Sequence, residues 1–227
     1  MTDRATLLTR LARLLATDAA PTDLASRLCT AGRLILGADG AAVTAAKTTA
    51  DRMTCCTTDA VIARLEDLQD VTGEGPCLDA FRYGTYFTLT VDETPDTRWP
   101  EFTRAAVDAV GRVTIFSFPM RPGGRTLGVV SAYLVGEGQL PEPTGAAQLV
   151  ADVVGAALLR DPALSTAGAL GSRDEVSLAS GMVVAQLHVP PDDALAILRA
   201  HAYATNTTLA ATARRVLNRE LDFREGL

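Results

Sequence analysis

The sequence predicts a chain of two domains, an α+β domain over residues 1–160 and an all-α domain of three helices over residues 161–227. Strand patterns and helix patterns occur side by side as far as residue 160. Beyond residue 172 only helix patterns remain. Between the two regions, residues 161–172 are rich in Ala, Gly and Ser, which is typical of a domain boundary.

The first elements are helices and short strands. Leu7, Leu11 and Leu14 fall on one face of a helix predicted over 4–16. That face either packs within the chain or forms the seam of a dimer. The elements that follow are predicted, in order, as a helix over 22–36, strands over 41–46 and 53–57, and a helix over 59–69.

A tight turn, Gly73-Glu74-Gly75-Pro76-Cys77, comes next, with Pro76 suited to the first position of a helix. The turn lacks the glycine and lysine spacing of a phosphate-binding loop. A long apolar helix over 143–160 closes the domain, with Leu149 and Val153 on one face. Between this turn and the helix over 143–160 we expect a strand over 86–91 and a helix from Arg98-Trp99-Pro100. A hairpin of strands 113–118 and 127–134 around the turn 121–125 is also expected there.

Three helix patterns make up the second domain. The first has the apolar spacing Val176, Ala179, Val183 and Leu187. The second begins at Pro190-Pro191, where Asp192 and Asp193 complement the positive end of the helix dipole. The third is capped by Thr207 or Thr208 and buries Leu209, Ala213, Val216 and Leu217. So small a core is expected to lean on the preceding helix or on a second subunit.

Charge and hydropathy exclude several classes of protein. No run reaches the roughly 18 apolar residues of a membrane span, and the charged N-terminus is unlike a signal peptide. We therefore expect a cytoplasmic protein without a membrane partner. The net charge is −6, and residues 161–227 carry six arginines against eight acidic residues. A site for nucleic acid must therefore be a local patch of arginines.

Cysteine and histidine usage limits the chemistry. The four cysteines form no C-x-x-C pair, so we predict buried thiols and neither a metal nor a cofactor. Both histidines, His188 and His201, lie near the C-terminus. Residues 1–180 thus offer no imidazole to activate a nucleophile. We predict no catalytic residue and no hydrolytic activity.

An ordered series of motifs resembles actinobacterial transcription antitermination regulators that join a GAF domain to an ANTAR domain. The series runs across most of the chain, and no single tetrapeptide in it is decisive. Its members are Leu65–Gln69, Gly73–Ala80, Arg98–Pro100, Ser117–Pro119 and Leu127–Gly128 in the first domain, and Ala179–Val183, Gln186–Leu187, Asp193–Leu195, Leu198–Ala202 and Leu209–Ala213 in the second.

The resemblance implies a GAF sensor, which is an antiparallel sheet flanked by helices, followed by an all-α three-helix ANTAR bundle. It implies an RNA-binding antiterminator that binds stem-loops in nascent transcripts as a homodimer. RNA loops splay their bases, which a few side chains on one protein face can read. The GAF domain would receive a small-molecule or protein signal. Asn-Lys and His residues associated with cyclic-nucleotide or bilin binding are absent from this region.

Candidate RNA contacts follow from the same resemblance. Many ANTAR domains carry Lys where this chain has Ser180, which leaves arginines as the main cations. For Arg199 the alternative is a surface ion pair with Asp192 or Asp193, and for Arg214 and Arg215 it is a solvated helix end. Gly181 is expected to allow close helix packing. The predicted RNA-binding residues are Arg173, Ser180, Arg199, Arg214 and Arg215.

Sensor residues and two other functions complete the expectations. Cys77 and Asp79, in the turn and the helix after it, are the sensor-pocket candidates. Cys77 at a helix start could have a lowered pKa and serve a redox sensor or enzyme, although a buried thiol is the simpler interpretation. Residues 194–220 also resemble a DNA-binding helix-turn-helix.

Overall fold

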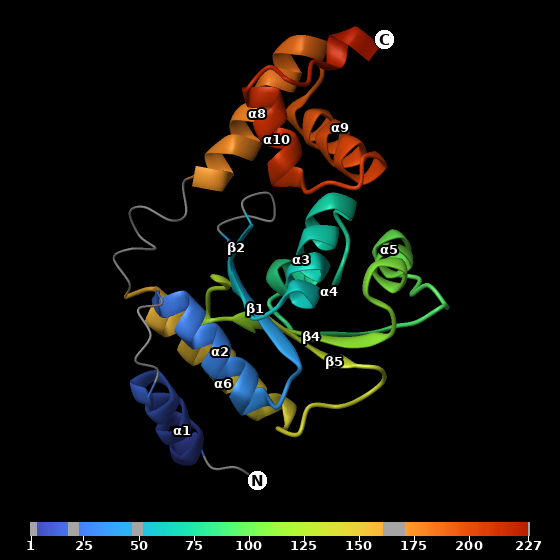
Figure 1. The fold of residues 1–227 in the computed structure, drawn as a ribbon. Helices are drawn as coiled ribbons and strands as arrows, with labels where there is room; N and C mark the ends of the chain where they lie inside the picture. The colour runs from blue at the N-terminus through green and yellow to red at the C-terminus, as the bar shows by residue number, and fades with distance from the viewer. Residues whose placement is uncertain (1–3, 18–22, 47–51, 161–170, 227) are drawn as a thin grey trace.

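The computed structural model describes residues 4–17, 23–46, 52–160 and 171–226. These residues form a three-layer domain with a sheet in the middle and a helical bundle at one end of it (Figure 1). None of the helices in these ranges is long and apolar enough to cross a bilayer.

The middle layer is a five-stranded antiparallel sheet in the spatial order β2-β1-β5-β4-β3. The predicted hairpin is present, with Ser117 opposite Ser131 and a 3₁₀ turn, η1, over Pro122–Gly124. Successive side chains of each strand point to opposite faces, so both faces of the sheet carry a core. The strands are β1 (Gly40–Ala45), β2 (Met53–Thr57), β3 (Phe87–Val91), β4 (Val113–Met120) and β5 (Gly128–Val135).

Helices α2 (Leu24–Leu36) and α6 (Thr144–Leu158) cover one face of the sheet, and α1 (Arg4–Thr17) packs on the outside of these two helices (Figure 1). Leu7 and Leu11 of α1 are buried in the core that these helices share with Phe118 and Val130. This face of α1 therefore packs within the chain, which decides between the two interpretations of its leucines.

The opposite face carries α3 (Ala60–Thr72), α4 (Pro76–Tyr83) and α5 (Pro100–Val110). Asp59 caps α3 by accepting hydrogen bonds from the backbone N–H groups of Val61 and Ile62. Gly73 ends it at φ 71°, a left-handed conformation that suits glycine. The C-terminal end of α3 is thereby placed beside the bundle (Figure 1).

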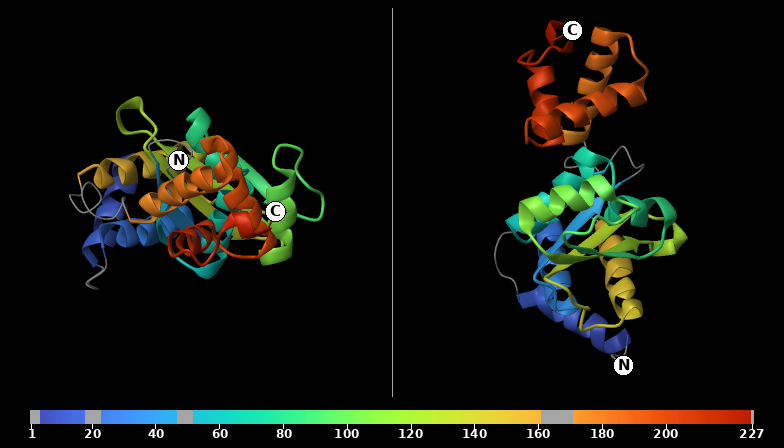
Figure 2. Two further views of the ribbon diagram at one scale, coloured as in Figure 1. Left: turned by 90° about the horizontal axis from the view of Figure 1, so that it is seen from above. Right: turned by 90° about the vertical axis from the view of Figure 1, so that its right-hand side faces the viewer.

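The bundle consists of α8 (Gly171–Leu187), α9 (Pro191–Ala204) and α10 (Leu209–Leu217), followed by a short 3₁₀ helix, η2, over Phe223–Gly226. Figure 2 shows it at the end of the molecule opposite α1. Its core has the predicted apolar positions, and Thr208 is the cap of α10, with its Oγ1 accepting from Ala211 N.

The predicted fold class, an antiparallel sheet flanked by helices followed by an all-α bundle, is confirmed. Element ends differ by a few residues, as expected where a helix frays or a strand continues past its buried part. Of the predicted boundary, 161–170 lies outside the described residues, and α8 already begins at Gly171. The apolar pattern of this helix begins only at Val176, so the sequence could not mark its first turn.

Candidate nucleic-acid interface and sensor site

Arg199, the central residue of the predicted RNA interface, contacts the sheet domain. It lies on α9, half-buried, and its Nε donates a 3.0 Å hydrogen bond to the backbone carbonyl of Asp70 on α3. A Cβ placed on Gly73 would lie 3.3 Å from Arg199 Nη1, so the guanidinium rests on the end of α3. Burial lowers the pKa of Arg199, and the nearby Asp70 carboxyl opposes this shift.

The alternative interpretation of Arg199, a surface ion pair with Asp192 or Asp193, was therefore wrong, while its RNA contact stays a prediction. Its Nε donates neither to Asp192 nor to Asp193, whose backbones form the first turn of the same helix. A residue of α3 takes that place, because α9 packs across the end of α3. The contact could not be predicted from local sequence pattern, because Arg199 and Asp70 are 129 positions apart in the chain.

The other candidate RNA contacts lie on different elements. Arg214 on α10 is exposed and pairs with Glu175 on α8, with Nε 3.1 Å from Oε2. Arg215 is half-buried, and Ser180 Oγ makes a 3.4 Å contact to the carbonyl of Pro191. The backbone of Arg173 belongs to the first turn of α8, while its side chain lies outside the described residues. The candidates therefore come from all three helices of the bundle, and their joint role in RNA binding stays a prediction.

Gly181 does not serve close helix packing. It is exposed on α8, and a Cβ added there would meet no heavy atom within 4 Å. The expectation was wrong because the α8 face that carries Gly181 points away from the bundle core, which Ala179 and Val183 occupy.

A second contact joins the two domains near the first. Arg64 on α3 donates a 2.7 Å hydrogen bond from Nη2 to Asn206 Oδ1, in the turn between α9 and α10. Asn206 adopts φ 50°, a left-handed conformation that asparagine tolerates. Beside this bond the two domains line a half-open cavity of about 300 Å³. Its lining residues are Arg64, Leu68, Val71, Ala105, Asp108, Ala109, Ala202, Tyr203, Asn206 and Thr207.

Cys77 is a structural residue of the sheet domain. Its side chain is completely buried between α4 and β5, and burial raises the pKa of the thiol. The backbone N–H of Cys77 donates to Gln69 Oε1 at 2.8 Å, and Gly75 packs against the side chain of Gln69. The glycine of this turn is needed because a Cβ on Gly75 would lie 2.4 Å from Gln69 Oε1. A reactive low-pKa thiol is therefore not present here.

Asp79 also has a structural role. Its Oδ2 accepts a 2.9 Å hydrogen bond from the indole Nε1 of Trp99, at the start of α5. Nearby, Glu74 Oε2 accepts from the backbone N–H groups of Glu101 and Phe102 at 3.0 and 3.3 Å. These two acids fasten α5 to α4 and the turn before it. Cys77 and Asp79 thus both have structural contacts, and their assignment to a sensor pocket stays a prediction.

A buried ionic cluster lies under the same turn, and the sequence analysis missed it. Arg52 Nη2 lies 2.7 Å from Glu66 Oε2 and 3.5 Å from Asp70 Oδ1. Arg52 and Glu66 are almost fully buried, and burial raises the pKa of Asp70. Burial and the charge of Asp70 also raise the pKa of neighbouring Asp67 to about 6. The signal available in the sequence was the polar pair Glu66 and Gln69 within an apolar helix face.

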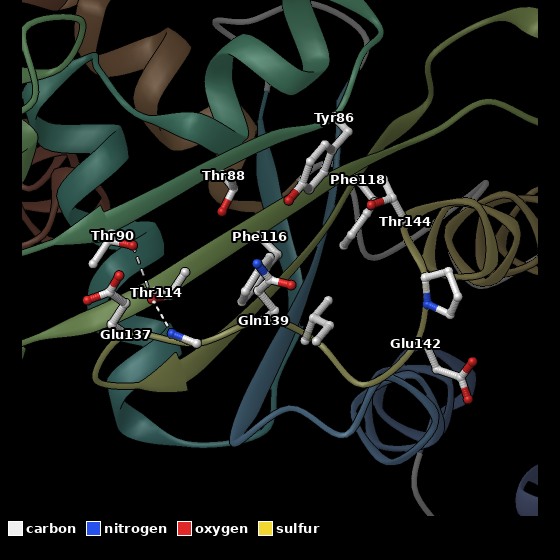
Figure 3. Close-up of a pocket in the computed structure, with 13 residues that line it drawn as sticks. Tyr86, Thr88, Thr90, Thr114, Phe116, Phe118, Glu137, Gln139, Glu142 and Thr144 are labelled. Atoms are coloured by element: carbon white, nitrogen blue, oxygen red, sulfur yellow. Dashed lines mark hydrogen bonds between the residues drawn. The ribbon is translucent and has the colours of Figure 1, made fainter.

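A hollow of about 640 Å³ lies between strands β3 and β4 and the segment 137–143 that leads into α6 (Figure 3). Aromatic rings of Phe116, Phe118 and Tyr86 form part of its wall, with Tyr86 stacked on Phe118 at 4.8 Å between ring centroids. Thr90 and Thr114 add hydroxyl groups that lie 3.3 Å apart. Neither Cys77 nor Asp79 lines it. The full lining is Tyr86, Thr88, Thr90, Thr114, Phe116, Phe118, Glu137, Gly138, Gln139, Leu140, Glu142, Pro143 and Thr144.

Comparisons with known proteins identify the bundle. Residues 165–217, which include α8, α9 and α10, match the model of the ANTAR domain. No curated protein matches the chain.

Fifteen chains of solved structures match the chain. One is the nlh2 GAF domain of A. aeolicus in an inactive state, at 11% identity over 66% of this chain and 90% of that one, with a TM-score of 0.42. Another is the chromophore-binding domain of an unusual bacteriophytochrome from R. palustris, at 15% identity over 73% and 64%, with a TM-score of 0.41. Similarity at this level leaves the sheet domain without a family assignment.

Proposed function

We propose that this chain is a signal-responsive, RNA-binding transcription antiterminator whose bundle binds stem-loops of nascent transcripts. The observation that supports the proposal is the match of residues 165–217 to the ANTAR domain. The role requires no catalytic step and places the protein in the cytoplasm, where transcripts are made. We propose that it acts as a homodimer, one subunit for each of two stem-loops.

The bundle can meet RNA through a few charged hydrogen bonds. Arg214 is exposed at the end of α10, and its single ion pair to Glu175 is solvated and therefore weak. Ser180 Oγ makes only a long contact and remains able to donate to a phosphate oxygen. Arg199 becomes available when it leaves the carbonyl of Asp70. Because contacts are few, the loss or gain of one is expected to change affinity measurably.

We propose a small molecule as the input, bound in the hollow between β3, β4 and the segment 137–143. The rings of Phe116, Phe118 and Tyr86 can stack on a planar ligand, and the hydroxyl of Thr90 can hydrogen-bond to it. The lining favours an aromatic or heterocyclic molecule with polar substituents over an aliphatic one.

The proposal is tested by titrating the full chain with a pool of hairpin RNAs and with duplex DNA of matched length at several salt concentrations. We expect hairpin binding that weakens with salt. Ser180→Lys should bind more tightly and increase the salt slope by about 0.7 to 0.9, the effect of one added phosphate contact. Equal or tighter binding of duplex DNA would favour the helix-turn-helix alternative instead.

A further inference from the structure

The residue expected to bind RNA is held by the other domain of the same chain. Arg199 Nε donates to the carbonyl of Asp70, and its guanidinium covers Gly73. The contact joins an output residue to the sheet domain, which we propose receives the signal. A guanidinium that donates to Asp70 cannot use the same N–H for a phosphate.

The C-terminal end of α3 is a suitable partner for a guanidinium. The last four carbonyls of a helix have no partner within the helix, and Asp70 lies in the last turn of α3. The helix dipole adds partial negative charge at this end. The Asp70 carboxyl contributes further, since its charge favours the protonated form of Arg199. The end of α3 therefore offers Arg199 an oxygen acceptor in a negative field, as an RNA phosphate would.

The seam between the domains is small enough to open. Besides the bond from Arg199, a side-chain hydrogen bond from Arg64 to Asn206 crosses it, and both of those residues are in contact with solvent. The cavity of about 300 Å³ beside this bond shows that the two surfaces are not closely packed. Contacts of this kind between domains of one chain are usually transient.

Contacts run from the seam into the sheet domain. Asp70, which holds Arg199, also lies 3.5 Å from Arg52, and Arg52 pairs with buried Glu66. A change that moves α3 against β1 would alter Asp70 and its hold on Arg199 together, since Glu66 Oε2 also accepts from Thr44 of β1.

We propose that the C-terminal end of α3 is an internal competitor of RNA, which docks the bundle by binding Arg199 and must release it before RNA binds. The inference rests on the proposed RNA-binding function and deepens it by naming how the same surface is regulated. RNA and the sheet domain then bind the bundle in mutually exclusive ways, and the signal acts by shifting the balance between them.

Two changes in the sheet domain release the bundle without altering it. Arg64→Ala removes the bond to Asn206. Gly73→Asn keeps the left-handed helix end, which asparagine tolerates, and puts a Cβ 3.3 Å from Arg199 Nη1. Matched controls are Arg112→Ala, at an exposed arginine paired with Glu137, and Gly84→Asn, the same change at the end of α4.

The full-length single and double variants are compared by small-angle X-ray scattering and by titration with a hairpin RNA, after circular dichroism has shown that they are folded. We expect Arg64→Ala/Gly73→Asn to have a larger radius of gyration and tighter hairpin binding. The gain is about tenfold if the docked form predominates by about ten to one. Arg112→Ala and Gly84→Asn should change neither measurement.

Three results would overturn the inference. An unchanged radius of gyration in the double variant would show that these contacts do not hold the bundle. A larger radius with unchanged hairpin affinity would show that α3 and RNA do not compete, and would leave the RNA-binding function standing. A larger radius without hairpin binding by any form, wild type included, would contradict the RNA-binding function itself and the inference with it.

Discussion

At the scale of single residues, Arg199 contacts Asp70 in the docked bundle and is proposed to contact RNA in the released one. Its substitution should therefore have opposing effects on hairpin affinity. Arg199→Ala removes one RNA contact and, at the same time, one docking contact. In the Arg64→Ala/Gly73→Asn background, where docking is already lost, we expect hairpin affinity to fall about tenfold, as for one charged hydrogen bond of roughly 1.5–3 kcal/mol. In the wild-type background the loss should be smaller.

This expectation is checked by measuring hairpin affinity over a salt series in the wild-type and the Arg64→Ala/Gly73→Asn backgrounds. Circular dichroism on the same samples shows whether the helices remain folded. The salt slope should decrease by about 0.7 to 0.9 in the released background. An equal loss in the two backgrounds would show that Arg199 serves RNA alone. No loss in either would place the RNA surface elsewhere on the bundle.

At the scale of elements, Glu74 in the turn before α4 caps the N-terminus of α5. Trp99 makes no side-chain capping bond of its own, and Glu74 Oε2 instead accepts from the N–H groups of Glu101 and Phe102. Its negative charge also suits the positive end of the helix dipole. Glu74→Ala should therefore lower the free energy of unfolding by about 1 to 2 kcal/mol.

Urea unfolding followed by circular dichroism measures this loss. Glu93→Ala, an exposed glutamate of the same domain, is the control and should remain within about 0.5 kcal/mol of wild type. A loss no larger than that of the control would show that water satisfies the start of α5 as well as Glu74 does.

At the scale of the whole molecule, the apolar faces that the sequence offered for a dimer contribute to the core of the single chain. Leu7 and Leu11 are buried within the chain, and Leu149 and Val153 pack against the same core. Leu8 on α1 and Leu34 on α2 remain exposed, at 37% and 41%. We expect a dimer at micromolar concentration in sedimentation, shifted toward monomer by Leu8→Glu/Leu34→Glu.

Leu178→Glu, at an exposed leucine of α8, is the control for an added charge and should leave the dimer intact. Sedimentation that shows only monomer for the wild-type chain would contradict dimerisation. A dimer that survives Leu8→Glu/Leu34→Glu would move the interface away from α1 and α2.

Local pattern determined most of the elements of this protein. Apolar spacing marked α3 and the bundle helices, and Asp59, Gly37 and Gly73 act at helix ends, where their side chains or their lack of one matter. These signals were readable because they depend on neighbours within a few positions. The resemblance added the ANTAR assignment of the bundle, which the comparison supports.

Contacts between distant residues decided the sites. Whether Leu7 faced a second subunit, whether Cys77 was reactive, and what Arg199 held depended on which elements packed together. The turn that resembled a sensor motif is a structural joint, because Gln69, Glu74 and Asp79 use their polar groups on the backbone and on Trp99. The sequence shows the charge and the length of an arginine side chain, but only the tertiary structure shows which acceptor it contacts. For Arg199 that partner is the end of α3, since a buried guanidinium requires a nearby oxygen acceptor and α3 supplies one.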